Sequence, residues 1–259
     1  MTDKILLGQV ALVTGSGRGL GKAYALELAR AGADVIITDR SSASAARFGE
    51  AASGEEVADE VRSLGVRSGF FAADLRDPAQ IEAMIAAIVK DFGRIDLLVN
   101  NAGGDIGAQT PRPDPNDCLD IKIEDIESVV GRNLLSTMYM CKFVGQHMRQ
   151  RKSGKIINIG SIGGHMAVAT GVVYGAAKLA VEHYTRCLAE QMRPYNVNVN
   201  CLAPGYAKSA RISATREINE DESLSRLQRF AEPEDMARII LFLAGPDSDR
   251  LTGETIVCW

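Results

Sequence analysis

The sequence predicts an α/β fold in which a parallel sheet is covered by helices on both faces. Short β-branched runs alternate with longer segments whose apolar residues recur every three or four positions, as Ile81, Ile85 and Ile88 do. The strand-like runs are almost continuously apolar, which is typical of strands buried on both faces. Alternation of strands and helices then gives right-handed crossovers and a doubly wound parallel sheet.

Seven strand-like runs follow one another along the chain. They occupy residues 10–14, 34–38, 68–73, 95–100, 155–160, 196–202 and 254–259. Helical patterns rich in Ala, Glu and Arg lie between them, and long helices are expected at roughly 122–151 and 172–193. The sequence contains no fixed-period repeat and no linker, so residues 1–259 are expected to form a single domain.

Three segments depart from this alternation. Residues 40–53 are rich in Ser and Ala and are expected to form a loop after the second strand. Residues 104–120 are rich in Pro and Asp, and residues 206–229 carry many charges. The last two segments follow the carboxyl ends of strands, where open α/β sheets bind their ligands. We therefore expect a ligand site at this edge, with residues 206–229 as a candidate lid.

The composition disfavours several kinds of partner. The net charge is −4 and acidic and basic residues are mixed along the chain, which argues against nucleic acid. The sequence has no apolar stretch of about 18 residues to cross a membrane, and its N-terminus lacks a signal-peptide pattern. The five cysteines show no C-x-x-C or Cys/His spacing, so we expect free thiols, no metal site and a cytoplasmic location.

A glycine-rich turn joins the first strand to the helix pattern that follows it. The turn runs from Thr14 to Gly21 with the pattern T-G-x-x-x-G-x-G. Gly15, Gly19 and Gly21 let the backbone turn sharply and approach a pyrophosphate closely, and the helix N-terminus adds N–H groups and the positive end of its dipole. Such turns also occur with nothing bound, so a second residue has to support this interpretation.

Asp39 supplies this support at the end of the second strand. A carboxylate at this position can accept hydrogen bonds from the ribose hydroxyls of a dinucleotide. It would repel the 2′-phosphate of NADP, so Asp39 favours NAD. Arg18 and Arg40 keep NADP open as the alternative, because a guanidinium can pair with that phosphate. The sequence thus predicts a Rossmann-like dinucleotide-binding fold.

Further motifs follow in a characteristic order. They are Asp74 after the third strand, Asn100-Asn101-Ala102-Gly103 after the fourth, Asn133 in the next helix, Ser161 after the fifth strand, Tyr174-x-x-x-Lys178, and Pro204-Gly205 after the sixth. Each motif alone is weak, and Y-x-x-x-K arises by chance in many helices. Together with the glycine-rich turn, and in this order, they resemble the short-chain dehydrogenase/reductases over almost the whole chain, in their single-domain branch.

The resemblance implies where a nicotinamide dinucleotide would lie. Leu20 would offer its backbone N–H to the pyrophosphate, and Asp74 and Leu75 would border the adenine. Asn101 would pack beside the ribose at the end of the fourth strand. The nicotinamide side would be bordered by Gly205, Tyr206 and Ser209. Ser209 stands where the family often has threonine, and it keeps the hydroxyl.

The residue types explain the chemistry that the resemblance implies. Hydride transfer to or from carbon leaves an oxygen that must gain or lose a proton. Free tyrosine holds its proton at neutral pH, but Lys178 lies at i+4 from Tyr174 on one helix face, and its ammonium favours the phenolate. Ser161 can hydrogen-bond the same substrate oxygen. By resemblance, Asn133 lies behind Lys178 and anchors a water chain. These four residues are the catalytic candidates for interconverting a small secondary alcohol and its ketone.

Two alternatives remain open. An NADPH-dependent 3-oxoacyl thioester reductase would need a basic patch for a carrier protein, and the acidic residues of the 206–229 segment weaken that patch. The basic residues are Arg211, Arg216, Arg226 and Arg229, and the acidic ones are Glu217, Glu220, Asp221 and Glu222. A non-catalytic dinucleotide sensor would be indicated by the loss of Tyr174, Lys178 or Ser161, and all three are present.

The two long predicted helices also bear on assembly. Both are apolar on more than one face, so each has a second face to bury. In the family that the chain resembles, these two helices pair across a two-fold axis between subunits. We therefore expect a homotetramer or a homodimer. Trp259 is expected either at such an interface or near the lid segment.

Overall fold

In the part of the chain that the structure describes, seven parallel strands form one sheet with the order β3-β2-β1-β4-β5-β6-β7. This computed structural model describes residues 4–210, 212, 225 and 228–259. The strands are β1 (Val10–Thr14), β2 (Asp34–Asp39), β3 (Ser68–Ala72), β4 (Leu97–Asn100), β5 (Gly154–Ile159), β6 (Val197–Ala203) and β7 (Thr255–Val257). The predicted parallel sheet is confirmed, and its strands lie within a few residues of the predicted runs.

The strand order runs outward from β1 in both directions. β2 and β3 lie on one side of β1, and β4 to β7 lie on the other. The connections therefore change direction between β1 and β4, which are paired in parallel with Val13 beside Val99. In an open α/β sheet such a switch point leaves a crevice at the carboxyl ends of the strands, and ligands bind there.

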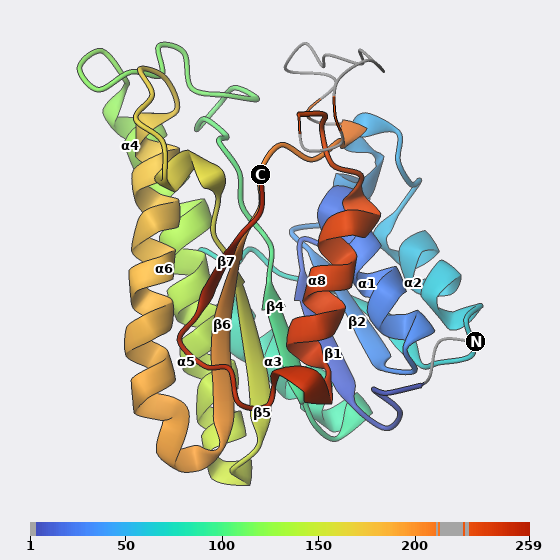
Figure 1. The fold of residues 1–259 in the computed structure, drawn as a ribbon. Coiled ribbons are helices and arrows are strands. Elements are labelled where there is room, and N and C mark those ends of the chain that lie inside the picture. The colour runs from blue at the N-terminus through green and yellow to red at the C-terminus, as the bar shows by residue number, and fades with distance from the viewer. Residues whose placement is uncertain (1–3, 211, 213–224, 226–227) are drawn as a thin grey trace.

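Helices cover both faces of the sheet (Figure 1). α1 (Gly19–Arg30), α2 (Gly54–Arg62) and α8 (Pro233–Ala244) pack on one face, and α3 (Pro78–Phe92), α5 (Ser136–Arg151) and α6 (Val172–Met192) pack on the other. α4 (Ile123–Val130) continues into α5 through the π-helical turn η2 (Gly131–Leu135). The two long helices predicted from the sequence are therefore present, the first with an irregular turn. None of the described helices is long and apolar enough to cross a membrane.

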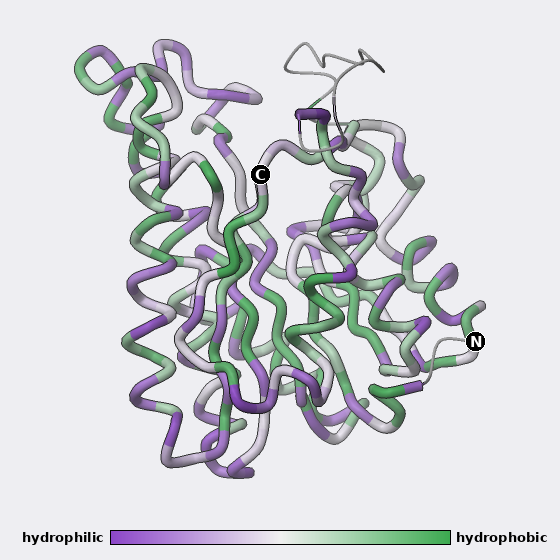
Figure 2. Tube along the Cα trace, viewed as in Figure 1, coloured by the Kyte–Doolittle hydropathy of each residue, from purple (hydrophilic) through white to green (hydrophobic). Residues whose placement is uncertain are grey.

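The core has one half on each face of the sheet. Alternate residues of β1 divide between the halves, so that Ala11 and Val13 pack with α1 and α8, whereas Val10 and Leu12 pack with α3 and α5. Figure 2 shows the resulting runs of hydrophobic residues along the central strands. Burial on both faces explains why these strands are apolar at every position.

The segment after β2 differs from the predicted loop. Ser42–Phe48 form a short 3-10 helix, η1, which ends at Gly49 with a φ of 74°. Glycine adopts this left-handed conformation without a steric penalty. The alanines of this segment favour a helical turn. Its composition of small residues is also typical of loops, so the sequence did not distinguish the two. The other 3-10 turns are η3 (Ile162–Gly164), η4 (Arg193–Tyr195) and η5 (Pro246–Ser248).

Asp96, just before β4, forms hydrogen bonds with residues from three segments of the chain. Its carboxylate accepts the N–H of Val10 (2.9 Å) and side-chain hydrogen bonds from Arg94 (2.7 Å) and Arg151 (2.8 Å). Burial by itself raises the pKa of Asp96, since the side chain is only 6% exposed. The three hydrogen bonds outweigh burial and hold the pKa below its ordinary value.

We expect Asp96→Asn to lower the free energy of unfolding by about 1.5–3 kcal/mol, because the amide lacks the charge that both guanidinium groups bind. Urea unfolding at neutral pH measures this loss. A carboxylate whose pKa is lowered by folding contributes stability above its unfolded pKa and loses it as the pH falls through the folded pKa. The difference from wild type should therefore shrink below about pH 4.

The exposed Asp91 provides the matched control for this change. Asp91→Asn should alter the free energy of unfolding by less than about 0.5 kcal/mol. Similar losses in the two variants would contradict a structural role for the Asp96 carboxylate.

Candidate active site

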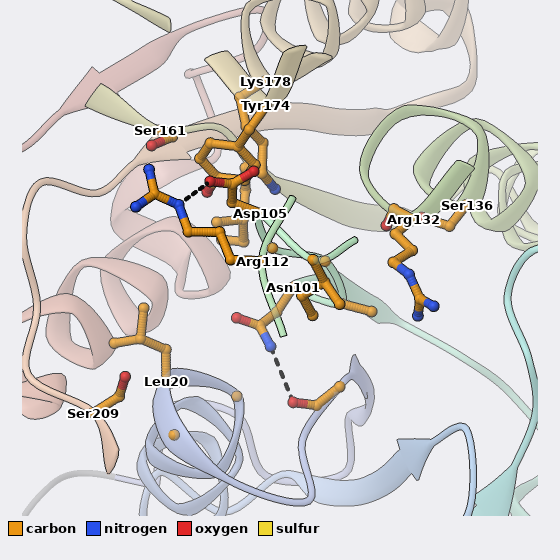
Figure 3. Close-up of a pocket in the computed structure, with 18 of the residues that line it drawn as sticks. Leu20, Asn101, Asp105, Arg112, Arg132, Ser136, Ser161, Tyr174, Lys178 and Ser209 are labelled. Atoms are coloured by element: carbon orange, nitrogen blue, oxygen red, sulfur yellow. Dashed lines mark hydrogen bonds and ion pairs between the residues drawn. The ribbon is translucent and has the colours of Figure 1, made fainter. Parts of the chain in front are cut away.

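A cavity of about 1000 Å³ opens at the carboxyl ends of the strands. The glycine-rich turn after β1 and the segments after β4, β5 and β6 line it, with Leu20 and Ser209 on one side and Ser161 and Tyr174 on the other (Figure 3). Every predicted site residue except Asn133 lines this cavity. These residues are Gly15, Arg18, Gly19, Leu20, Gly21, Asp39, Asp74, Leu75, Asn101, Ser161, Tyr174, Lys178, Gly205, Tyr206 and Ser209.

The glycine-rich turn is packed too closely to hold side chains at two of its glycines. A Cβ atom on Gly15 would lie 2.9 Å from the Cα of Ala102, and one on Gly21 would lie 2.3 Å from the carbonyl oxygen of Gly15. The Asn101 amide fixes the turn by donating to the carbonyl oxygens of Thr14 (2.9 Å) and Gly15 (3.1 Å). Bare backbone at the N-terminus of α1 suits a pyrophosphate, so the residues present fit a dinucleotide.

Glu50 also binds this turn, which the sequence did not predict. Its carboxylate accepts the N–H of Gly19, and its Oε1 accepts the N–H of Ala210 (2.7 Å). Glu50 thereby joins the first residue of α1 to the segment after β6. No local motif could signal this contact, because its partners are far away in the sequence.

Asp39 lies beside the turn at the carboxyl end of β2. Its Oδ1 accepts the N–H of Arg40 (2.7 Å), and a Cβ atom on Gly17 would lie 3.2 Å from its Oδ2. Burial raises the pKa of Asp39, and the hydrogen bond from Arg40 and the charge of Arg18 oppose this effect. The carboxyl group therefore borders the cavity where a ribose attached to the pyrophosphate would lie.

Asp74 is already engaged by a neighbouring cation. Arg76 donates from Nε to Oδ1 (3.0 Å) and from Nη2 to Oδ2 (2.5 Å). These hydrogen bonds lower the pKa of Asp74 to about 2. Both oxygens are thus partly satisfied within the chain, and a contact from Asp74 or Leu75 to adenine stays a prediction.

Ser161 and Tyr174 converge from two different elements. Ser161 follows β5, and its Oγ accepts the N–H of Gly163 (3.1 Å). A Cβ atom on Gly163 would lie 3.5 Å from Ser161 Oγ and 3.9 Å from the Tyr174 ring, so both side chains lie against this glycine. α6 can approach because residue 175 is glycine, where a Cβ atom would lie 2.5 Å from the carbonyl oxygen of Gly163. The Ser161 hydroxyl hydrogen can donate to a substrate in the cavity.

Lys178 lies one helical turn after Tyr174 on α6, and only 3% of it is exposed. Its Nζ donates to the carbonyl oxygen of Ile159 (2.7 Å) and lies 5.8 Å from the centre of the Tyr174 ring. All three residues line the cavity, with Lys178 next to Tyr174 and Ser161 on the other side of the tyrosine ring (Figure 3).

Asn133 is fully buried in the π-helical turn η2. Its side-chain amide donates to the carbonyl oxygens of Gly104 (2.9 Å) and Val129 (2.8 Å), and its Oδ1 accepts the N–H of Gly104 (2.8 Å). The side chain therefore holds the backbone after β4 in place. The role of Asn133 as the anchor of a water chain behind Lys178 stays a prediction.

A second buried group lies on α6 behind the cavity. Glu182 is 1% exposed, and its Oε1 lies 2.9 Å from Nε2 of His165. His165 does not line the cavity, so this contact lies outside the lining. Among the described residues, no group of three His, Cys, Asp or Glu side chains is placed to hold a metal ion.

Gly205, Tyr206 and Ser209 border the cavity beside β6. The end of the chain packs on Gly205, where a Cβ atom would lie 2.7 Å from the carbonyl oxygen of Cys258. Trp259 lines a smaller cavity with Met166, Tyr206 and Phe230, beside the start of the predicted lid. Most of residues 206–229 lie outside the described residues, among them Arg211, Arg216 and Arg226, so the lid and its basic patch stay predictions.

The cavity also has lining residues that the sequence did not single out. Ile106, Met166 and Val168 are apolar, Arg132 and Ser136 come from η2 and α5, and Asp105 and Arg112 come from the 104–120 loop. The sequence placed this loop at the correct edge of the sheet. It carried no motif that indicated which of the loop's side chains would turn inward.

Comparison of the sequence with known proteins identifies its family. The sequence matches the family described as short chain dehydrogenase over residues 9–221. The chain belongs to the short-chain dehydrogenase family. It is 40% identical to cyclohexanol dehydrogenase of Rhodococcus sp. (strain TK6), with 99% of this chain and 97% of that protein covered. It is 34% identical to 3-oxoacyl-[acyl-carrier-protein] reductase FabG of Vibrio cholerae, with 97% and 96% covered.

A solved structure with the same fold is 7α-hydroxysteroid dehydrogenase in complex with NADH and 7-oxo glycochenodeoxycholic acid. It is 26% identical to this short-chain dehydrogenase and superposes with a TM-score of 0.86, covering 99% of this chain and 94% of the other. The predictions of the family and of an NAD(P)-dependent alcohol dehydrogenase or ketone reductase are therefore confirmed.

Proposed function

We propose that this short-chain dehydrogenase interconverts a secondary alcohol and its ketone, with NAD as the dinucleotide. The observation that carries the proposal is the convergence of Ser161 and Tyr174 on Gly163, with Lys178 beside Tyr174, in the cavity that contains the glycine-rich turn. Apolar lining side chains suit a hydrocarbon skeleton. Cyclohexanol, the substrate in the name of the 40% identical relative, is the first candidate.

The residues of this chain would divide the proton chemistry among them. Ser161 donates a hydrogen bond to the substrate oxygen and holds it beside Tyr174. The Tyr174 oxygen takes the proton from the alcohol during oxidation and returns it during reduction. The Lys178 ammonium stabilises the negative charge on that oxygen. A bound nicotinamide dinucleotide would supply the hydride chemistry at the carbinol or carbonyl carbon.

A substrate screen tests the proposed function. The purified protein is mixed with cyclohexanol, open-chain secondary alcohols and the matching ketones, with NAD or NADP in each dinucleotide state. Absorbance of the reduced nicotinamide should report turnover of cyclohexanol with NAD. Dinucleotide binding without turnover of any alcohol or ketone would instead favour the non-catalytic sensor. Turnover confined to 3-oxoacyl thioesters with NADPH would favour the thioester reductase.

The dinucleotide preference depends on Asp39. We expect wild type to have at least about a tenfold higher kcat/KM with NAD than with NADP, since the carboxylate would face the 2′-phosphate. Asp39→Ser should lower this ratio by about tenfold or more, because it removes the repulsion and leaves Arg18 and Arg40 beside the phosphate. Steady-state kinetics with both dinucleotides measure the ratio. Wild-type preference for NADP would contradict the role given to Asp39.

We also propose that the chain forms a homodimer or a homotetramer through the surface formed by η2 and α6. Leu135 on η2 and Leu179 on α6 are 38% and 44% exposed. Sedimentation should give two or four times the chain mass of 27.8 kDa. Leu179→Glu should shift the distribution towards the monomer, whereas Leu119→Glu, at a 91% exposed loop position, should not. A monomeric wild type would contradict the proposal.

A further inference from the structure

The 104–120 loop is held firmly where it enters the cavity. The Asn133 amide binds both the N–H and the carbonyl oxygen of Gly104, and Asp125 accepts the N–H of Ala108 (2.7 Å). Asp105 and Arg112 lie on this anchored segment and line the cavity. These anchors flank Asp105 and fix its backbone, and the hydrogen bond from Arg112 Nε joins Arg112 to it.

Asp105 and Arg112 form a polar pair with unused hydrogen-bonding atoms. The Asp105 Oδ2 accepts from Arg112 Nε (3.0 Å) and from Asn116 Nδ2 (2.8 Å). The Asp105 side chain is only 9% exposed, and its Oδ1 is buried without a hydrogen-bonding partner among the described residues. The two terminal nitrogens of Arg112 have no hydrogen-bonding partner in the described part of the chain.

The pair lies beside the first turn of α6, which carries Tyr174. A Cβ atom on Gly171, the residue before α6, would lie 3.6 Å from Asp105 Oδ2 and 4.0 Å from Arg112 Nη2. Figure 3 shows Arg112 and Asp105 on the side of the cavity where Tyr174 and Ser161 lie. A molecule whose oxygen is bound by Ser161 and Tyr174 therefore meets Asp105 and Arg112 with its remaining atoms.

The chemistry of the pair defines the group that it can bind. A buried carboxylate without enough donors is costly, so Asp105 favours a ligand group that can donate a hydrogen bond over one that only accepts. The terminal guanidinium nitrogens of Arg112, whose side chain is 36% exposed, offer hydrogen-bond donors to an acceptor on the ligand. A carboxylate on the ligand would satisfy Arg112 but would face the charge of Asp105. A hydroxyl group donates and accepts at once, carries no charge, and satisfies both residues.

We propose that Asp105 and Arg112 bind a second hydroxyl group of the substrate. This inference rests on the proposed function and narrows its substrate class to secondary alcohols that carry a further hydroxyl, such as cyclic diols. The second hydroxyl is held and does not react, while the carbinol beside Tyr174 is oxidised. The polar pair thus determines specificity at the end of a cavity whose other lining side chains include Ile106, Met166 and Val168.

The test compares cyclohexanol with cyclohexane-1,2-, 1,3- and 1,4-diols at saturating dinucleotide. For wild type, kcat/KM of the best diol should exceed that of cyclohexanol by about tenfold or more, since cyclohexanol leaves both polar groups unpaired. Arg112→Met and Asp105→Asn should each lower this ratio at least about tenfold. Arg112→Lys should restore part of it. Arg193→Met, which removes a cation from an exposed ion pair with Glu190, should leave the ratio unchanged.

A purely structural role for the pair predicts a different result. If Arg112→Met and Asp105→Asn lower kcat/KM for cyclohexanol and for the diols by the same factor, or if wild type does not prefer any diol, the proposal is overturned. If no alcohol is oxidised, the proposed function fails, and calorimetry decides the inference separately. Binding of the three diols is then measured in the presence of NADH. Weakening by Arg112→Met supports the second-hydroxyl site, and equal or absent binding overturns it.

Discussion

Replacing Tyr174 with phenylalanine is expected to lower kcat about a thousandfold, with dinucleotide affinity nearly unchanged. The substitution removes only the phenolic oxygen. The ring keeps its place against Gly163, and Lys178 keeps its hydrogen bond to the carbonyl oxygen of Ile159. Among the described tyrosines that line the cavity, the other one is Tyr206, which lies beside β6 and not on α6 with Lys178. The loss should therefore fall on proton transfer while the fold and the dinucleotide site are retained.

Three measurements separate this result from a general loss of structure. Steady-state kinetics give kcat, calorimetry gives the dissociation constant of NADH, and thermal unfolding reports stability. Tyr184→Phe is the matched control, because Tyr184 lies on the same helix and packs into the core away from the cavity. The control should retain most of the activity. Turnover of Tyr174→Phe at the wild-type rate would remove Tyr174 from the proposed mechanism.

The parts of this protein that follow from local sequence were predictable. A strand buried on both faces is apolar at every position, so β1 and the other strands were found within a few residues. Tyr174 and Lys178 could be placed together because four residues span one helical turn. Gly15 and Gly21 indicated bare backbone, and the structure shows that a Cβ atom would collide at both positions.

Contacts between distant segments were not predictable in the same way. Glu50 binds the N–H groups of Gly19 and Ala210, and only the folded chain brings these residues together. Asp105 and Arg112 belong to a loop without periodicity, so no pattern indicated that both would line the cavity. Asp74 was interpreted as an adenine contact, but Arg76, two residues away, also binds its carboxylate.

Replacing Ser161 with alanine is expected to lower kcat by about 100- to 1,000-fold. The Ser161 Oγ is fixed by the N–H of Gly163, so its hydrogen points away from that donor and can bind the substrate oxygen. Such a donor stabilises the charge that develops on this oxygen as the proton and the hydride move. Alanine removes the donor and leaves Tyr174 and Lys178 in place. Kinetics with the best alcohol from the screen measure the change.

The same hydroxyl has a structural role that the experiment must separate from catalysis. Ser161 begins η3, and losing a side-chain cap of this kind costs about 1 kcal/mol of stability. Ser53→Ala is the matched control, since Ser53 caps α2 by accepting the N–H of Glu56 (3.1 Å) away from the cavity. It should show a similar loss of stability with an unchanged kcat. Ser161→Thr, which keeps a hydroxyl, should retain more activity than Ser161→Ala.

The division of the Ser161→Ala effect between kcat and KM then identifies the role of the hydroxyl. If it stabilises charge only as the reaction proceeds, kcat and kcat/KM fall together and KM hardly changes. If it only shapes η3, Tyr174 and the dinucleotide would both be displaced, because Gly163 lies next to the Tyr174 ring. NADH affinity would then weaken along with kcat. A fall in kcat with NADH affinity preserved assigns Ser161 to the substrate oxygen, and weakened NADH binding would contradict that assignment.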